Sequence, residues 1–292
     1  MYAPLLVLIG AKNLTSSELS FHFAHANGFP AGSYNTLFSA LPRHFRRIHV
    51  ERFGHDPALP VNGNWRNQVL ELIRHVKKEN KDPRGVYGIG HSFGAVVTYM
   101  AACEAPELFR GLILFDPPLV VGPLSHFFKF AKYTPLINKL TPAKLAQTRN
   151  TSWPSSTDMV AYFHGKSLFR DMDKRCVRDY VTAVTARKGD NISLTFKADV
   201  EAALFRNVPH NLAKYTGKLK CPAVLVTGNK SNVCKPEMYM RLMKQNAIEH
   251  TQLPGGHMFP LEKPEMVAEF ITSTLNEWNK DGVFQGSCRL SC

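Results

Sequence analysis

The chain has 292 residues, of which 44% are hydrophobic and 20% charged, which suits one large domain with a substantial core and excludes a largely disordered chain. Its formal net charge is +13, from 36 Lys and Arg against 23 Asp and Glu. The basic residues gather only in small clusters, such as residues 43–47 and 77–81, so we predict no nucleic-acid partner.

The N-terminal part of the chain alternates predicted strands with predicted helices. Residues 47–52 alternate apolar and polar side chains with the period of a strand, whereas apolar positions within residues 64–76 are spaced for one helical face. In chain order, the predictions are strands at residues 4–9, 19–24 and 47–52, a helix at 64–76, a strand at 85–89, a helix at 94–103 and a strand at 111–115. This alternation favours a parallel sheet with helices on both faces.

Residues 120–207 interrupt the alternation. The segment carries many Lys and Arg, and its aromatic side chains are Phe127, Phe128, Phe130, Tyr133, Trp153, Tyr162, Phe163 and Phe169. Because the segment lies between two buried strands, we predict an inserted, mostly helical cap. Aromatic side chains in a cap favour a hydrophobic substrate, since apolar pockets bind acyl and aryl groups.

Beyond the insertion the alternation returns, with predicted strands at residues 223–226 and 250–253 and helices that begin at Pro236 and Pro264. The chain is therefore predicted to be an α/β protein with a mostly parallel, doubly wound sheet. The predicted boundaries are residues 1–119 and 208–280 for the core, 120–207 for the cap and 281–292 for a loose C-terminal tail.

A nucleophile pattern lies between the predicted strand at residues 85–89 and the helix that follows it. Gly90-His91-Ser92-Phe93-Gly94 matches G-x-S-x-G, in which the serine occupies a sharp, strained turn from strand to helix. Gly90 and Gly94 allow the strand and the helix to approach without Cβ clashes. We therefore predict that Ser92 is a nucleophile.

A serine hydroxyl is a poor nucleophile unless a base lies beside it. His257 follows the last predicted strand, on a glycine-rich loop, and comes after the serine in chain order, so we predict that it is the base. Asp116 ends a buried strand, and Pro117 biases its backbone toward an extended conformation. An Asp before Pro also initiates turns, but we predict that Asp116 orients the imidazole of His257.

Two backbone amides are candidates for an oxyanion hole, which needs donors where negative charge develops. The amide of Phe93 is next to the nucleophile, and the amide of Phe29 lies in the loop after an early strand. Gly28 allows a close approach of the backbone in that loop, although residues 27–30 are also compatible with a plain turn.

These segments resemble the α/β-hydrolase superfamily over residues 19–280, through residues 27–30, 90–94, 115–117 and 256–257. The resemblance implies a mostly parallel sheet of roughly eight strands with an inserted cap and no cofactor. It also implies Ser92 as the nucleophile, His257 as the base and the amides of Phe29 and Phe93 as the oxyanion donors.

The chain departs from the family pattern in three places. The family usually carries its acid after the strand at residues 223–226, but residues 228–232 contain no carboxylate. Some members place the acid after the preceding strand, which is the position of Asp116. Asn27 stands where a His-Gly pair is common, and the N-terminal part is short for the usual first hairpin.

We therefore predict a serine hydrolase that cleaves an ester or thioester of a hydrophobic small molecule through an acyl-enzyme. Ser92 argues against haloalkane dehalogenase and epoxide hydrolase chemistry, because both need Asp at the nucleophile position that Ser92 occupies. C–C hydrolases, lyases, acyltransferases and peracid-forming enzymes use the same triad and stay open as alternatives. A non-catalytic binding protein is a further alternative, because no carboxylate follows Gly228.

The six cysteines are scattered, and none forms a C-x-x-C pair, so the sequence indicates neither a zinc site nor a dense disulfide framework. Cys288 and Cys292 lie in the polar tail. No apolar run reaches about 18 residues, and residues 4–9 lack the basic flank of a signal peptide. We predict a cytoplasmic protein without a transmembrane segment, metal or cofactor, while the oligomeric state stays open.

Overall fold

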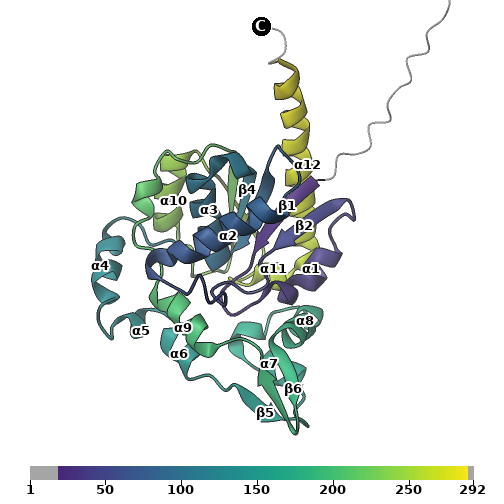
Figure 1. Cartoon of the computed structure of the whole chain (residues 1–292), viewed down its shortest axis with the longest axis vertical. Coiled ribbons are helices and arrows are strands. Elements are labelled where there is room, and N and C mark those ends of the chain that lie inside the picture. The colour runs from purple at the N-terminus through teal and green to yellow at the C-terminus, as the bar shows by residue number, and fades with distance from the viewer. Residues whose placement is uncertain (1–18, 289–292) are drawn as a thin grey trace, which may run out of the picture.

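A six-stranded sheet forms the centre of the computed structural model, which describes residues 19–288, with side chains through residue 280 (Figure 1). The strands are β1 (Leu19–Ala24), β2 (Phe45–His49), β3 (Val86–His91), β4 (Phe109–Phe115), β8 (Ala223–Gly228) and β9 (Glu249–Leu253). They lie in the order β2-β1-β3-β4-β8-β9, and every neighbouring pair is parallel. The predicted parallel fold is confirmed, with six described strands instead of roughly eight. The strand predicted at residues 4–9 lies outside the described residues.

The two faces of the sheet pack against two separate hydrophobic cores, because successive strand side chains point to opposite faces. In β4, Leu112 and Leu114 face one core, and Ile113 and Phe115 face the other. The first core is covered by α2 (Arg66–Glu79), α3 (Phe93–Glu104) and α10 (Pro236–Asn246). The second is covered by α1 (Asn35–Ser39), α11 (Phe259–Glu262) and α12 (Pro264–Cys288). The sheet is therefore doubly wound, as predicted.

The chain between β4 and β8 leaves the sheet and builds a layer of its own, seen in the lower part of Figure 1. Its helices are α4 (Pro123–Ala131), α5 (Ile137–Leu140), α6 (Ala143–Gln147), α7 (Met159–His164), α8 (Lys174–Val184) and α9 (Ala198–Arg206). It also contains an antiparallel sheet of β5 (Ser152–Pro154), β7 (Asn191–Leu194) and β6 (Thr185–Lys188), which the prediction of a mostly helical segment does not include. Gly189, with φ of 59°, provides the left-handed turn residue between β6 and β7.

The last helix, α12, closes the second core with Val267, Ile271 and Leu275, all at most 1% exposed. It continues to Cys288, within the segment that the sequence predicts as a loose tail. Residues 289–292, which include Cys292, lie outside the described residues.

Candidate active site

Ser92 occupies the turn between β3 and α3, where the sequence predicts a strained elbow. Its φ of 54° and ψ of −118° are rare for a residue with a side chain, and a hydrogen bond of 2.8 Å from its amide to Phe115 O fixes the turn. A Cβ on Gly90 would lie 2.5 Å from Gly94 O, and one on Gly94 would lie 2.6 Å from His25 O. Both glycines are therefore required by close backbone approach.

The structure brings Ser92, His257 and Asp116 together at the carboxyl end of the sheet. His257 Nε2 lies 3.0 Å from Ser92 Oγ, and His257 Nδ1 lies 2.5 Å from Asp116 Oδ2. Asp116 is completely buried, whereas the side chain of His257 is 21% exposed. The imidazole therefore donates from Nδ1 to the carboxylate and accepts the serine proton at Nε2, the arrangement that activates a serine.

The carboxylate of Asp116 has a second donor that sequence reasoning missed. Ser231 Oγ donates to Asp116 Oδ2 over 2.5 Å, and the same hydroxyl accepts a bond of 3.1 Å from the amide of Val233. Ser231 lies in the loop after β8, in the segment where the family pattern usually has its acid. The hydroxyl at this position therefore stabilises the negative charge of a carboxylate that is supplied from β4 instead.

The backbone of Asp116 differs from the extended conformation that the following proline predicts. Its φ is 43°, and its amide donates a hydrogen bond of 2.8 Å to Val226 O of the neighbouring strand β8. That bond and the sharp end of β4 outweigh the local preference, and they turn the carboxylate toward His257.

His91, inside the nucleophile pattern, links three segments of the site. Burial lowers the pKa of His91 to about 3, with His257 as a further cause, so its ring is neutral at pH 7. Its Nε2 donates to the carbonyl of His257 over 2.9 Å, which leaves Nδ1 to accept from the hydroxyl of Tyr34 over 2.8 Å. The Tyr34 hydroxyl in turn accepts from the amide of Ala26 over 3.2 Å. This series of hydrogen bonds was not predicted from the sequence.

The two predicted oxyanion donors differ in their hydrogen bonding. The amide of Phe93 opens α3, where the first amides of a helix have no partner within the helix. The amide of Phe29 donates to Ala26 O over 3.0 Å and closes a turn in which Gly28 has φ of 78°. The Phe93 amide is therefore available to a ligand, while the Phe29 amide is engaged within its own loop.

The layer between β4 and β8 holds this loop through α9. Asn27 Nδ2 donates to Glu201 O over 3.0 Å, and the Glu201 carboxylate lies so close to Gly28 that a Cβ there would be 2.6 Å from Oε1. Arg149 Nη1 lies 2.7 Å from Glu201 Oε2, and its Nη2 donates to the Tyr180 hydroxyl over 3.0 Å. The two side chains of the ion pair are only 19% and 12% exposed, so this contact is largely shielded from water.

The aromatic side chains of the same layer fall into two groups. The first packs around Phe29, whose ring centroid lies 4.8 Å from that of Tyr180 and 5.5 Å from that of Phe169. Trp153, Tyr162 and Phe163 complete this group. The second group, which includes Phe127 and Phe130, is exposed. The first group fills the interior of the layer, so the number of aromatic residues does not by itself indicate a substrate pocket.

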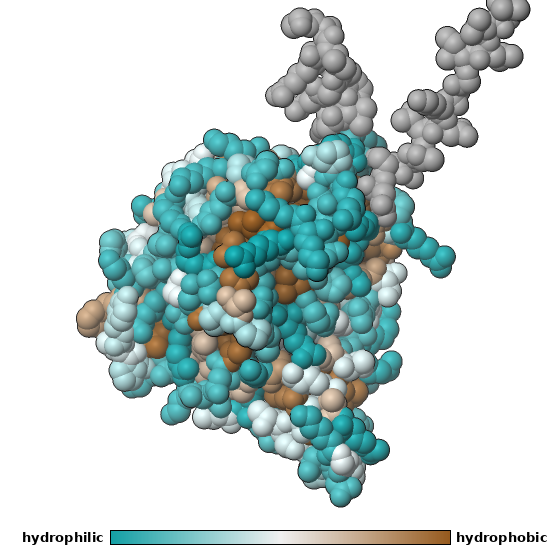
Figure 2. Space-filling view, in the orientation of Figure 1, coloured by the Kyte–Doolittle hydropathy of each residue, from teal (hydrophilic) through white to brown (hydrophobic). Residues whose placement is uncertain are grey.

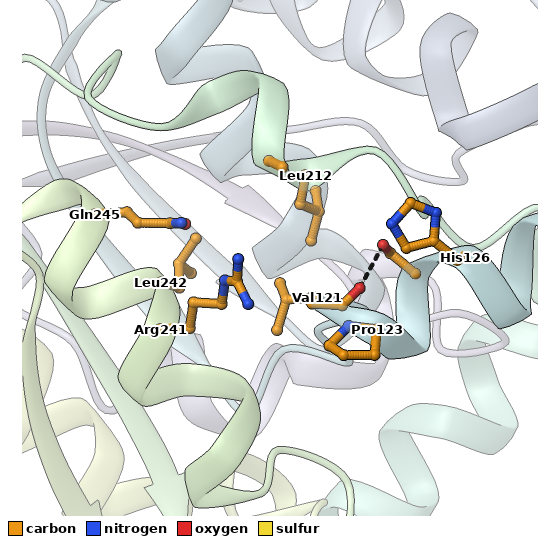
Figure 3. A pocket seen from close by; sticks show the side chains of 10 residues that line it. Val121, Pro123, His126, Leu212, Arg241, Leu242 and Gln245 are labelled. Atoms are coloured by element: carbon orange, nitrogen blue, oxygen red, sulfur yellow. Dashed lines mark hydrogen bonds between the residues drawn. The ribbon is translucent and has the colours of Figure 1, made fainter.

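A cavity of about 360 Å³ lies between α4, α10 and the short 3₁₀ helix η5 (Leu212–Tyr215) (Figure 3). It is lined by the apolar side chains of Val121, Leu212 and Leu242 and by the polar groups of His126, Arg241 and Gln245. Neither Ser92, nor His257, nor Asp116 contributes to this lining, so the cavity does not enclose the reacting atoms.

Within the described part of the chain, no group of three or more His, Cys, Asp or Glu is arranged to hold a metal ion. The cysteines for which the structure describes side chains are free, and they are Cys103, Cys176, Cys221 and Cys234. None of the described helices is both long enough and apolar enough to cross a membrane.

Comparison with known proteins gives one family and two kinds of relative. The model of the alpha/beta hydrolase family matches residues 23–270. A type I acyl-CoA thioesterase of Penicillium roqueforti is 24% identical over 228 residues, which cover 73% of this chain and 47% of that protein. The chain thus spans about half the length of this curated relative. A monoglyceride lipase homolog of Monkeypox virus is 23% identical over 260 residues, which cover 85% of this chain and 86% of that protein.

Solved structures agree on the fold. A peroxisomal alpha-beta-hydrolase of Saccharomyces cerevisiae superposes with a TM-score of 0.74 at 18% identity, over 90% of this chain and 78% of that one. A thioesterase domain from the curacin biosynthetic pathway superposes with a TM-score of 0.68 at 15% identity, over 87% of this chain and 91% of that one. At such identities the likeness concerns the fold alone.

Proposed function

Because this chain belongs to the alpha/beta hydrolase family, we propose that it hydrolyses an ester or thioester of a hydrophobic small molecule through an acyl-enzyme at Ser92. The observation that carries the proposal is the hydrogen-bonded series from Ser92 Oγ through His257 to Asp116 Oδ2, with distances of 3.0 Å and 2.5 Å. The similarity to an acyl-CoA thioesterase and to a monoglyceride lipase homolog supports thioester and ester bonds as the substrate class.

In the proposed first half-reaction, Ser92 Oγ attacks the carbonyl carbon while His257 Nε2 takes the hydroxyl proton. The buried carboxylate of Asp116, held by Ser231, stabilises the imidazolium. The tetrahedral oxyanion accepts a hydrogen bond from the amide of Phe93. The bond to the leaving oxygen or sulfur then breaks, and His257 returns its proton to the departing group.

In the second half-reaction a water molecule attacks the acyl ester on Ser92. His257 removes a proton from this water, the bond between the acyl carbon and Ser92 Oγ breaks, and His257 gives the proton back to the serine. For the amide of Phe29 to act as a second oxyanion donor, its hydrogen must be shared between the oxyanion and Ala26 O, which already accepts it.

We further propose that residues 120–207 act as a cap over the oxyanion loop of residues 26–29. The support is the contact of Glu201 with Asn27 and Gly28, together with the packing of Tyr180 on Phe29. The cap thus limits the space in which the acyl or leaving group of the substrate lies. A cytoplasmic location stays a prediction from the sequence.

The proposal is tested with p-nitrophenyl esters and acyl-CoA thioesters of graded chain length. Ser92→Ala and Asp116→Asn are expected to lower kcat by about 10³-fold or more, and Ser92→Ala to abolish labelling by a fluorophosphonate. Ser167→Ala and Asp171→Asn, at exposed positions, are matched controls expected to retain wild-type rates. If wild-type Ser92 resists the fluorophosphonate and no ester or thioester is cleaved, the chain is a binding protein on this fold. If Asp116→Asn retains full activity, the acid is assigned wrongly.

A further inference from the structure

Large apolar side chains are exposed mainly on one short stretch of the chain. Five of the eight such residues in the described part lie within residues 127–145. They are Phe127 at 44% exposure, Phe130 at 68%, Tyr133 at 85%, Leu140 at 38% and Leu145 at 73%. We call these five side chains the apolar face of α4–α6. Figure 1 places α4 and α5 at the edge of the molecule, and Figure 2 shows an apolar group projecting from that edge.

The exposure follows from how α4 is oriented. Leu124 and Phe128, four residues apart, pack against the first hydrophobic core, and Ala131 on the same side is fully buried. Phe130 therefore faces away from the protein, whereas Phe127 is half-exposed at the edge of the packed side. Just beyond the helix, Lys132 donates a hydrogen bond of 2.9 Å to Asn64 Oδ1, in the segment before α2. The helix is thus fixed on its inner side, while its outer aromatic side chains remain largely exposed among the described residues.

The charged side chains of the segment that carries the apolar face are all basic. No Asp or Glu occurs between Asp116 and Asp158 in the sequence. Lys129, Lys139 and Lys144 are exposed along the same helices, and none of them forms a salt bridge with a described residue. Exposed aromatic and leucine side chains interleaved with lysines are what an amphipathic segment uses at the interface of an anionic bilayer.

We propose that the apolar face of α4–α6 docks on an anionic lipid surface, with its aromatic and leucine side chains in the interface and the three lysines beside the lipid headgroups. A second copy of the chain is disfavoured as the occupant, because two such faces would place lysines against lysines. The inference does not depend on the chemistry of Ser92, since lipid binding is measured without any turnover.

Sedimentation with lipid vesicles tests the proposal on the full chain. Phosphatidylcholine vesicles with phosphatidylglycerol are expected to bind the wild type at least about ten-fold more tightly than vesicles of phosphatidylcholine alone, and added salt is expected to weaken the binding. Phe130→Ser with Tyr133→Ser, and separately Lys129→Glu with Lys144→Glu, are each expected to reduce binding about ten-fold or more. Thermal melting verifies that both variants are folded.

Two matched controls distinguish binding through the apolar face from nonspecific hydrophobic binding and from an effect of net charge. Leu70→Ser with Leu168→Ser removes exposed apolar side chains elsewhere, and Lys77→Glu with Lys174→Glu makes the same charge change elsewhere. Both controls are expected to bind as the wild type does. Equal binding by the wild type and the Phe130→Ser, Tyr133→Ser variant would overturn the proposal. So would a concentration-dependent dimer in analytical ultracentrifugation that this variant loses, because the face would then cover a second copy.

Discussion

At the scale of single residues, the neutral ring of His91 holds the carbonyl of His257 and the hydroxyl of Tyr34 at the same time. We expect His91→Leu to lower kcat by about 10- to 100-fold with little change in KM, since small displacements of a catalytic base are costly. His91→Gln keeps an N–H that can reach His257 O, so it should recover part of the rate. Steady-state kinetics on a soluble ester give both values, and wild-type kcat in His91→Leu would show that the link has no influence on catalysis.

Glu71 is a second residue whose environment has a measurable consequence. Burial raises the pKa of Glu71 from its usual 4.5 to about 7, although the amide of Gly54 donates to its carboxylate over 3.0 Å. The folded protein therefore binds this proton more tightly than the unfolded chain does. The resulting stabilisation is complete below about pH 4.5 and is lost as the pH rises through about 7.

Glu71→Gln retains an acceptor for Gly54 but has no charge to bury. We expect the variant to be more stable than the wild type at about pH 8, by at most about 3 kcal/mol, and to approach it at about pH 5. Urea unfolding at the two pH values measures this difference. A variant less stable than the wild type at both would mean that the ionised carboxylate is well accommodated.

The positions of the site residues were predictable where a local sequence pattern marks them. Gly90-His91-Ser92-Phe93-Gly94 is contiguous, and Asp116 and His257 each follow a recognisable strand, so all three could be named from the sequence. Ser231 and Tyr34 could not, because each acts through a partner far away in the chain, Asp116 and His91. Only the folded sheet brings those partners within hydrogen-bonding distance.

At the scale of elements, Arg149 pairs with Glu201 of α9, the residue whose carbonyl accepts the hydrogen bond from Asn27 Nδ2. Arg149→Met leaves the Glu201 carboxylate shielded and unpaired, so we expect a loss of about 2–4 kcal/mol in stability and a lower kcat/KM. Glu201→Gln added to Arg149→Met should restore part of both. Thermal and urea melts with kinetics complete the double-mutant cycle.

Arg175→Met is the matched control, because its pair with Asp173 is solvent-exposed and should leave stability nearly unchanged. Additive effects of the Arg149 and Glu201 substitutions would show that the pair contributes no coupling.

The alternation of strands and helices in the core was predictable from the sequence, because the apolar residues there recur with the period of a strand or of a helix. The sheet β5-β7-β6 was not predictable. Its strands are at most four residues long, which is too short for an alternation of apolar and polar residues to be recognised.

At the scale of the whole molecule, α12 contributes to the second core through residues that end well before its last turn. Trp278 stacks on Tyr87 at a centroid distance of 6.1 Å and lies against Gly111. We expect truncation after Lys280 to change Tm by no more than about 2 °C, whereas truncation after Glu277 removes Trp278 and lowers Tm by several times as much. Calorimetry of the two truncated chains measures this, and a large effect of the shorter deletion would show that the last residues are needed for folding.

The proposed placement of the acid directly after β4 also implies an order in which the three site residues are synthesised. Ser92 and Asp116 belong to one continuous β3-α3-β4 unit, while His257 follows β9 near the end of the chain. A ribosome therefore completes Ser92 and Asp116 before it begins the insertion, and it supplies His257 only when most of the protein has been synthesised. Under the proposed mechanism, the nascent chain is inert toward esters until β9 has paired with β8, and the onset of turnover would mark the completion of the sheet.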